Sequence, residues 1–162
     1  MATFVLVHGA FHGGWCWRHV AARLCGAGHA VIAPTLTGLG ERSHLAGPDV
    51  DLDTHVADVT AVFDFQEVTD AVLVGHSYGG MVVGGVGDRL PDRIRSIVYL
   101  DALVPEDGKS VLDFQPPERR QAMIRSATAG DGRQLPANPA AFYDVDDPDL
   151  AAWVDAKCVP QP

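Results

Sequence analysis

Short continuous apolar runs alternate along the chain with longer segments of helical periodicity. The apolar runs lie at residues 4–7, 30–33, 71–75 and 94–100. Runs of this length, bounded by glycine, proline or polar residues, are typical of strands that are buried on both faces of a parallel sheet. The pattern therefore predicts four strands, the second of which is stopped by Pro34.

The segments between the predicted strands have the periodicity of amphipathic helices. Residues 15–25 carry apolar side chains at helical spacing, and Gly26 ends this helix. After a loop at residues 35–50, either Asp51 or Asp53 is expected to cap a second helix with one apolar face. Each predicted helix is long enough to cover one face of a sheet.

A third helix is predicted over residues 77–90, and Pro91 closes it. Because strands alternate with helices at this spacing, the connections should be right-handed crossovers between parallel strands. We therefore predict the α/β class, with a parallel sheet and flanking helices on both faces.

The composition changes after the fourth predicted strand. Residues 105–162 are richer in Pro, Asp, Gln and Arg, and they contain no further run of strand type. Short helices are expected at 118–126 and at 148–157, the second capped by Asp147. We predict a core at residues 1–104, with 105–162 laid over it as a lid or cap.

Composition and charge narrow the classes of function. The chain has 162 residues and 47% apolar content, as expected for one globular domain. Its formal charge of −9 argues against nucleic-acid binding, since no basic stripe could neutralise phosphates. No apolar run approaches the roughly 18 residues of a membrane span, so no membrane partner is expected.

Three cysteines are an odd number and show no C-x-x-C spacing. We interpret them as free thiols in a reducing compartment, and the N-terminus has no basic region of a signal peptide. A cytoplasmic location is therefore predicted, with no metal and no cofactor.

Residues 75–79 read Gly-His-Ser-Tyr-Gly, between a predicted strand and a predicted helix. In such a G-x-S-x-G turn the serine backbone is strained, and small residues on either side permit the close approach. Ser77 would then project its oxygen at the N-terminus of a helix, with the N–H of Tyr78 as one oxyanion donor. The alternative is a structural turn in a Rossmann-like sheet, where the glycines only let the helix pack.

The loop after the first strand reads His-Gly-Ala-Phe-His-Gly-Gly-Trp over residues 8–15. Such a loop can bring the N–H of Ala10 within reach of the Ser77 oxygen. Fixed N–H donors that face a tetrahedral intermediate lower its barrier by roughly 3–4 kcal/mol for one donor. The two segments together predict a nucleophile with an oxyanion hole.

This loop, Trp17 after it, the 75–80 turn and the strand at 97–102 resemble the α/β-hydrolase fold over roughly residues 3–110. Within that fold they are similar to the plant methylesterase and hydroxynitrile-lyase group and its bacterial esterase relatives. The resemblance implies a nucleophilic Ser77 and an oxyanion hole from the N–H groups of Ala10 and Tyr78.

The resemblance also suggests substrate-binding residues. Phe11 would line the acyl or alcohol pocket, and Gly9 and His12 belong to the same loop, where packing is the alternative role for His12. The lyase members carry threonine in place of Gly9 and glutamate in place of His76. Those differences favour hydrolysis of a small, largely apolar ester.

The sequence has no candidate for the general base that the family takes from a histidine after the nucleophile. In the family, the acid and the histidine that acts as general base follow later strands, yet no histidine here lies beyond His76. We expect His8 to hold its loop by hydrogen bonds, and the His76 side chain to point away from the serine oxygen. The other histidines outside the loop are expected at surface positions of helices or loops: His19, His29, His44 and His55.

The predicted fold is therefore incomplete, with the N-terminal part of the sheet and a partial lid. The strand at residues 97–100 would form an open edge, and Asp101 after it is expected to be structural. Three explanations of the incomplete fold remain. The chain is a piece of a longer hydrolase, it forms a symmetric homodimer, or a partner chain supplies a complementing C-terminal fragment. The alternative to an esterase is a non-catalytic fragment or interaction module.

Overall fold

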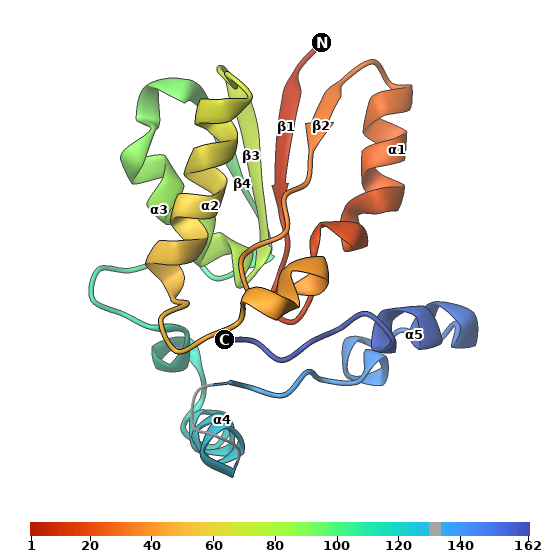
Figure 1. Ribbon diagram of the computed structural model, residues 1–162, viewed down its shortest axis with the longest axis vertical. Coiled ribbons are helices and arrows are strands. Elements are labelled where there is room, and N and C mark those ends of the chain that lie inside the picture. The colour runs from red at the N-terminus through yellow and green to blue at the C-terminus, as the bar shows by residue number, and fades with distance from the viewer. Residues whose placement is uncertain (130–133) are drawn as a thin grey trace.

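The computed structural model describes residues 1–129 and 134–162. Four parallel strands form one sheet in the order β2-β1-β3-β4 (Figure 1). The strands are β1 (Thr3–Val7), β2 (Ala30–Ile32), β3 (Ala71–Ser77) and β4 (Ile94–Ala102). The helices are α1 (Arg18–Gly26), α2 (Leu52–Phe65), α3 (Gly79–Arg89), α4 (Pro117–Ala129) and α5 (Pro148–Asp155). The predicted α/β class is confirmed.

Helices cover both faces of the sheet, because the side chains of β1, β2 and β3 alternate between two apolar clusters. Val5 and Val7 of β1 pack with Phe63 of α2 and with apolar residues of α3. Leu6, between them in the sequence, packs instead with Trp17 on the face that α1 covers. This alternation is the reason why the strands read as continuous apolar runs.

The boundaries differ from the predictions at functionally important points. A short 3-10 segment precedes α1, which begins at Arg18 rather than near residue 15. The strand β3 continues to Ser77, and α3 begins only at Gly79, because a positive φ at Ser77 ends the extended backbone. Of the two candidate caps of α2, Asp51 is the N-cap, and its carboxylate accepts the Thr54 N–H at 2.9 Å.

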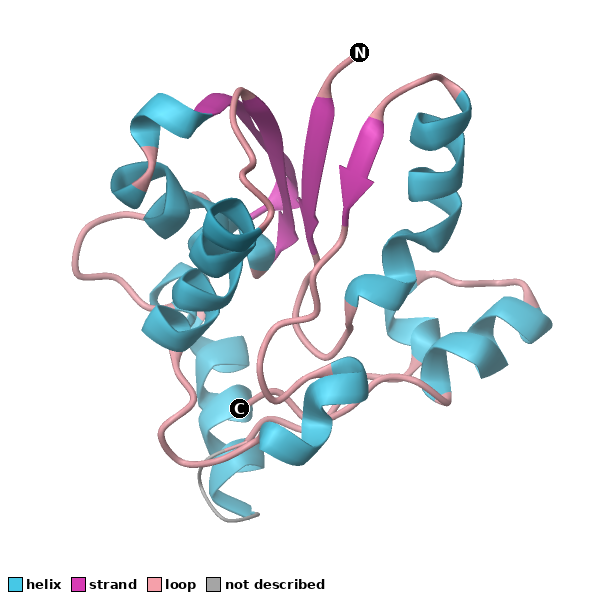
Figure 2. Cartoon of the chain, turned by 45° about the horizontal axis from the view of Figure 1, so that its top comes forward, coloured by secondary structure: helices cyan, strands magenta, loops and turns pink. Residues whose placement is uncertain are grey.

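The segment 105–162 adds no strand to the sheet among the residues that the structure describes. Figures 1 and 2 show α4 and α5 beyond the carboxyl ends of the strands, as a cap over that end of the sheet. No helix within residues 1–129 and 134–162 has the length and apolar character needed to cross a membrane.

The strand β4 lies at one edge of the sheet, as the sequence predicts. Val98 and Leu100 are 41% and 48% exposed, although both belong to a strand. The cluster under α1 includes residues of β1, β2 and β3 but none of β4. An apolar strip of β4 therefore faces solvent.

Candidate active site

Ser77 occupies the sharp turn between β3 and α3. Its φ of +52° is in the left-handed region, which a residue with a Cβ adopts at a cost of roughly 1–3 kcal/mol. Such strain persists only where the surroundings impose it. Because α3 begins two residues later, Ser77 lies at a helix N-terminus, where the helix dipole favours negative charge.

Two glycines make this turn sterically feasible. A Cβ on Gly75 would lie 2.6 Å from the carbonyl oxygen of Gly79. A Cβ on Gly79 would lie 2.8 Å from the carbonyl oxygens of both Val7 and His8. The N-terminus of α3 therefore packs directly on the end of β1, which only glycine permits.

The loop after β1 lies against the serine. A Cβ on Gly9 would be 3.1 Å from the Cβ of Ser77 and 3.2 Å from Nδ1 of His76. His8 is fully buried and anchors this loop. Its Nδ1 donates to the Gly9 carbonyl at 2.8 Å, and its Nε2 accepts the Leu36 N–H at 3.1 Å. His8 has the structural role expected of it.

A cavity of about 1010 Å³ opens beside the serine. Its wall brings together all six residues that the sequence singles out as site candidates: Gly9, Ala10, Phe11, His12, Ser77 and Tyr78. Residues of α4 and of the segment 135–143 form the opposite wall. The cap therefore encloses a chamber over the carboxyl ends of β1 and β3.

Residues 4–161 match the family model described as the alpha/beta hydrolase family. The chain belongs to the alpha/beta hydrolase family. It is 50% identical to a carbendazim-hydrolyzing esterase of Nocardioides sp. (strain SG-4G), over 99% of this chain and 69% of that protein. It is 33% identical to Methylesterase 2 of Arabidopsis thaliana, over 66% of this chain and 41% of that protein.

Solved structures agree with this assignment. An extracellular alpha/beta-hydrolase from a Paenibacillus species matches with a TM-score of 0.91 and 29% identity, over 100% of this chain and 67% of that chain. These similarities identify an esterase-type alpha/beta hydrolase. The chain spans about two thirds of the Nocardioides enzyme and less than half of the plant enzyme.

Two further histidines of this alpha/beta hydrolase lie in the cavity wall. His12 donates from Nδ1 to the Ala10 carbonyl at 2.7 Å. Its ring stacks on that of Trp15, with 5.2 Å between the ring centroids. His76 was expected to point away from the serine oxygen; its ring packs edge-on against Trp17, and the residue contributes to the cavity wall. Burial lowers the pKa of His76.

The prediction that His55 lies at the surface is wrong. His55 is 1% exposed, and its Nε2 donates to the Thr37 carbonyl at 2.9 Å. Because a carbonyl only accepts, Nδ1 carries no proton and accepts from the Tyr78 hydroxyl at 2.7 Å. A signal was present in the sequence: His55 shares the apolar face of α2 with Val59 and Phe63, at steps of four residues.

The structure also places Asp101 and the three remaining histidines. Asp101, at the end of β4, lines the cavity and has a φ of +43°. His19 and His44 are exposed, as expected, whereas His29 is half-buried and accepts the Ala2 N–H at 3.2 Å.

We expect the stability of the fold to fall in mild acid because of His8. Burial lowers the pKa of His8 from 6.5 to about 4. The folded state therefore binds this proton less readily than the unfolded chain, so the stabilisation is complete above pH 6.5 and is lost as the pH falls towards 4. The full loss is roughly 3 kcal/mol of unfolding free energy.

Unfolding in urea at pH 7.5 and at pH 5 would measure the part of this loss of unfolding free energy that occurs above pH 5. The variant His8→Gln keeps a donor and an acceptor but does not titrate, so its unfolding free energy should depend less steeply on pH. His55 and His76 are present in both proteins, so their contributions to the pH dependence cancel in the comparison. An equal pH dependence of the two proteins would contradict the assignment to His8.

Proposed function

We propose that this chain carries the nucleophile and the oxyanion hole of a serine carboxylic-ester hydrolase. Ser77 is the nucleophile, and the N–H groups of Ala10 and Tyr78 stabilise the oxyanion. The observation that supports this most is the left-handed backbone of Ser77 beside a cavity, with Gly9 packed directly against it. A purely structural turn has no need for a strained serine at a cavity wall.

In this mechanism the Ser77 Oγ attacks the acyl carbon of the ester and loses its proton to a base. The negative charge that develops on the carbonyl oxygen is stabilised by the two N–H groups and by the N-terminus of α3. Collapse of the tetrahedral intermediate releases the alcohol and leaves an acyl-serine. Water then attacks the acyl carbon, the carboxylic acid is released, and the base returns a proton to the Ser77 oxygen.

The cavity favours a small, largely apolar ester. Phe11 of the oxyanion loop lies opposite apolar side chains of the cap, among them Leu112, Met123 and Phe142. Gly9, Phe11 and His12 are the proposed substrate contacts of the loop. The absence of a Cβ at Gly9 lets this loop pack closely against Ser77 and His76.

The general base is the part that this chain does not supply after its nucleophile. Its sequence has no histidine beyond His76, and His12 and His55 are engaged by the Ala10 carbonyl and by Tyr78. Without one member of a triad, roughly 10³–10⁴-fold acceleration over water remains. We therefore propose that efficient turnover needs complementation by further polypeptide that brings a histidine and an acid.

A fluorophosphonate probe tests the proposal because it reacts with an activated serine and is detected by mass. We expect covalent labelling of the folded chain at a single site, on the peptide that contains Ser77. Well-folded protein that shows no labelling under prolonged exposure would exclude the proposed nucleophile. It would favour the alternative, a non-catalytic interaction module of the same fold.

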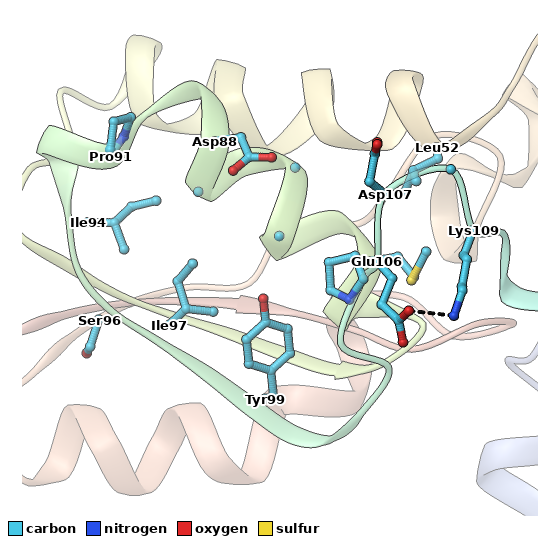
Figure 3. Close-up of a pocket in the computed structure, with 16 residues that line it drawn as sticks. Leu52, Asp88, Pro91, Ile94, Ser96, Ile97, Tyr99, Glu106, Asp107 and Lys109 are labelled. Carbon is cyan, nitrogen blue, oxygen red and sulfur yellow. Dashed lines mark hydrogen bonds and ion pairs between the residues drawn. The ribbon is translucent and has the colours of Figure 1, made fainter. Parts of the chain in front are cut away.

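The open edge of the sheet supports a polypeptide partner. Beside the exposed strip of β4, a groove of about 760 Å³ lies between α3 and β4 (Figure 3). Ile97 and Tyr99 of β4 form one wall, and Asp88 of α3 lies across from them. We propose that the complementing C-terminal fragment, or a second copy of the chain, covers this edge.

We expect a homodimer when no complementing fragment is present, and Val98→Lys should convert it to a monomer. A lysine in the apolar strip of an edge strand opposes strand pairing. Light scattering after size-exclusion chromatography measures the mass. Leu150→Lys is the matched control, since Leu150 is also 41% exposed but lies on α5.

A monomeric wild-type chain without esterase activity would contradict both the homodimer and the active-enzyme account.

The free state of the cysteines, Cys16, Cys25 and Cys158, supports the proposed cytoplasmic location.

A further inference from the structure

The peptide group between Ala10 and Phe11 is held at both of its polar atoms. The Ala10 carbonyl accepts from Nδ1 of His12 at 2.7 Å, and the Phe11 N–H donates to Oε1 of Gln161 at 3.2 Å. In a trans peptide the carbonyl and the N–H point in opposite directions. The two hydrogen bonds therefore fix the orientation of this peptide plane, which directly follows the peptide that carries the proposed oxyanion donor, the Ala10 N–H.

Phe11 needs such support because its φ of +68° is in the left-handed region. This conformation costs a residue with a Cβ roughly 1–3 kcal/mol and persists only where neighbours impose it. The Phe11 carbonyl accepts the Val159 N–H at 3.0 Å, in addition to the bond from the Phe11 N–H to Gln161. Both backbone polar atoms of Phe11 are thus bound by the segment 158–162.

Gln161 is itself fixed to the cap. It is 8% exposed, and its backbone pairs with Leu135 in both directions, at 2.9 and 2.8 Å. Leu135 lines the cavity on the cap side, and Phe11 lines it on the loop side. The segment that carries Gln161 runs back from α5 past the carboxyl end of the sheet (Figure 1).

We propose that Gln161 is a positioning residue that couples the cap to the oxyanion loop. Its side-chain oxygen holds the Ala10–Phe11 peptide and so limits the rotation of the Ala10 backbone, which carries the N–H proposed to face Ser77. Its backbone takes its own position from Leu135, so a displacement of the cap would move the oxyanion donor as well. The catalytic consequence rests on the proposed esterase function, whereas the coupling itself does not.

Hydrogen exchange of single backbone amides, followed by NMR on the full chain, tests the coupling without any need for activity. Gln161→Met has similar length and lacks the acceptor, so the Phe11 amide should exchange about tenfold faster than in the wild type. Gln161→Glu retains an acceptor oxygen and should restore slow exchange. Gln115→Met is the control, because Gln115 lines the same cavity without a bond to the loop.

The rate of fluorophosphonate labelling at Ser77 provides the second readout. It should fall about fivefold in Gln161→Met and recover in Gln161→Glu. A Phe11 amide that exchanges freely in the wild type, or equally in the wild type and Gln161→Met, would overturn the proposal. So would equal acceleration at the Leu135 amide, which would indicate a general loosening of the tail.

The proposed esterase function and the proposed positioning role of Gln161 can be distinguished by how each of them fails. If Ser77 of the wild type is not labelled while Phe11 exchange follows the expected pattern, the coupling is supported and the esterase function is not. If labelling occurs but does not depend on Gln161, the esterase function is supported and the positioning role is overturned.

Discussion

Replacement of Ser77 by alanine should abolish covalent labelling and any ester hydrolysis that passes through an acyl-enzyme. Alanine removes the only atom that forms the acyl-enzyme, so any hydrolysis that remains is direct attack by water, assisted by the oxyanion hole and by substrate binding alone. The backbone cost of a left-handed residue is the same for alanine as for serine. The unfolding free energy should therefore change by less than about 0.5 kcal/mol.

Ser126→Ala is the matched control for this prediction. Ser126 is on α4 and lines the same cavity, but it lies outside the strained turn. Labelling with a fluorophosphonate, followed by mass analysis of the peptides, should be unchanged in this variant. If Ser77→Ala retained labelling, or if Ser126→Ala lost it, the nucleophile would have been assigned to the wrong residue.

Gly80→Ala should destabilise the protein strongly. A Cβ at this position would lie 2.1 Å from the backbone carbonyl oxygen of Leu103, at the end of β4. A backbone atom cannot give way as a flexible side chain can, so α3 and β4 would have to separate. We expect a loss of at least about 3 kcal/mol, a large part of the stability of a small domain.

Urea unfolding and soluble yield would measure this effect, with Gly26→Ala as the control. Gly26 is the last residue of α1, and a Cβ there would meet nothing within 4 Å. We expect Gly26→Ala to be neutral or stabilising by up to about 1 kcal/mol, since alanine reduces the freedom of the unfolded chain. Equal stabilities of the two variants would refute the close packing of α3 on β4.

The strands and the serine turn could be predicted because their determinants are local. A buried parallel strand needs a continuous apolar run, and a strand-to-helix turn with a serine needs small residues beside it. Gly75 and Gly79 satisfy that need within five residues of sequence, and the structure shows why larger residues would clash there. The loop after β1 was recognised through the resemblance of its motif to a known family, whereas the packing of Gly9 on Ser77 was revealed by the structure.

The contacts that escaped prediction join residues far apart in the sequence. The helical periodicity of α2 indicates that His55 is buried, but it does not reveal its partner Tyr78, which lies 23 residues away. The hydrogen bond from Phe11 to Gln161 spans 150 residues. Ordinary polar residues such as glutamine carry no signal of a partner until the fold brings that partner within reach.

By itself, the sequence determined the α/β class, the order of the elements and the serine turn, because each depends on side-chain periodicity or on steric limits over a few residues. Only the tertiary structure decided which partners the buried histidines bind, which face of β4 is not covered by a helix, and how the segment 158–162 reaches the loop after β1. Those properties depend on how distant segments pack, and packing is decided by the summed burial and hydrogen bonding of the whole chain.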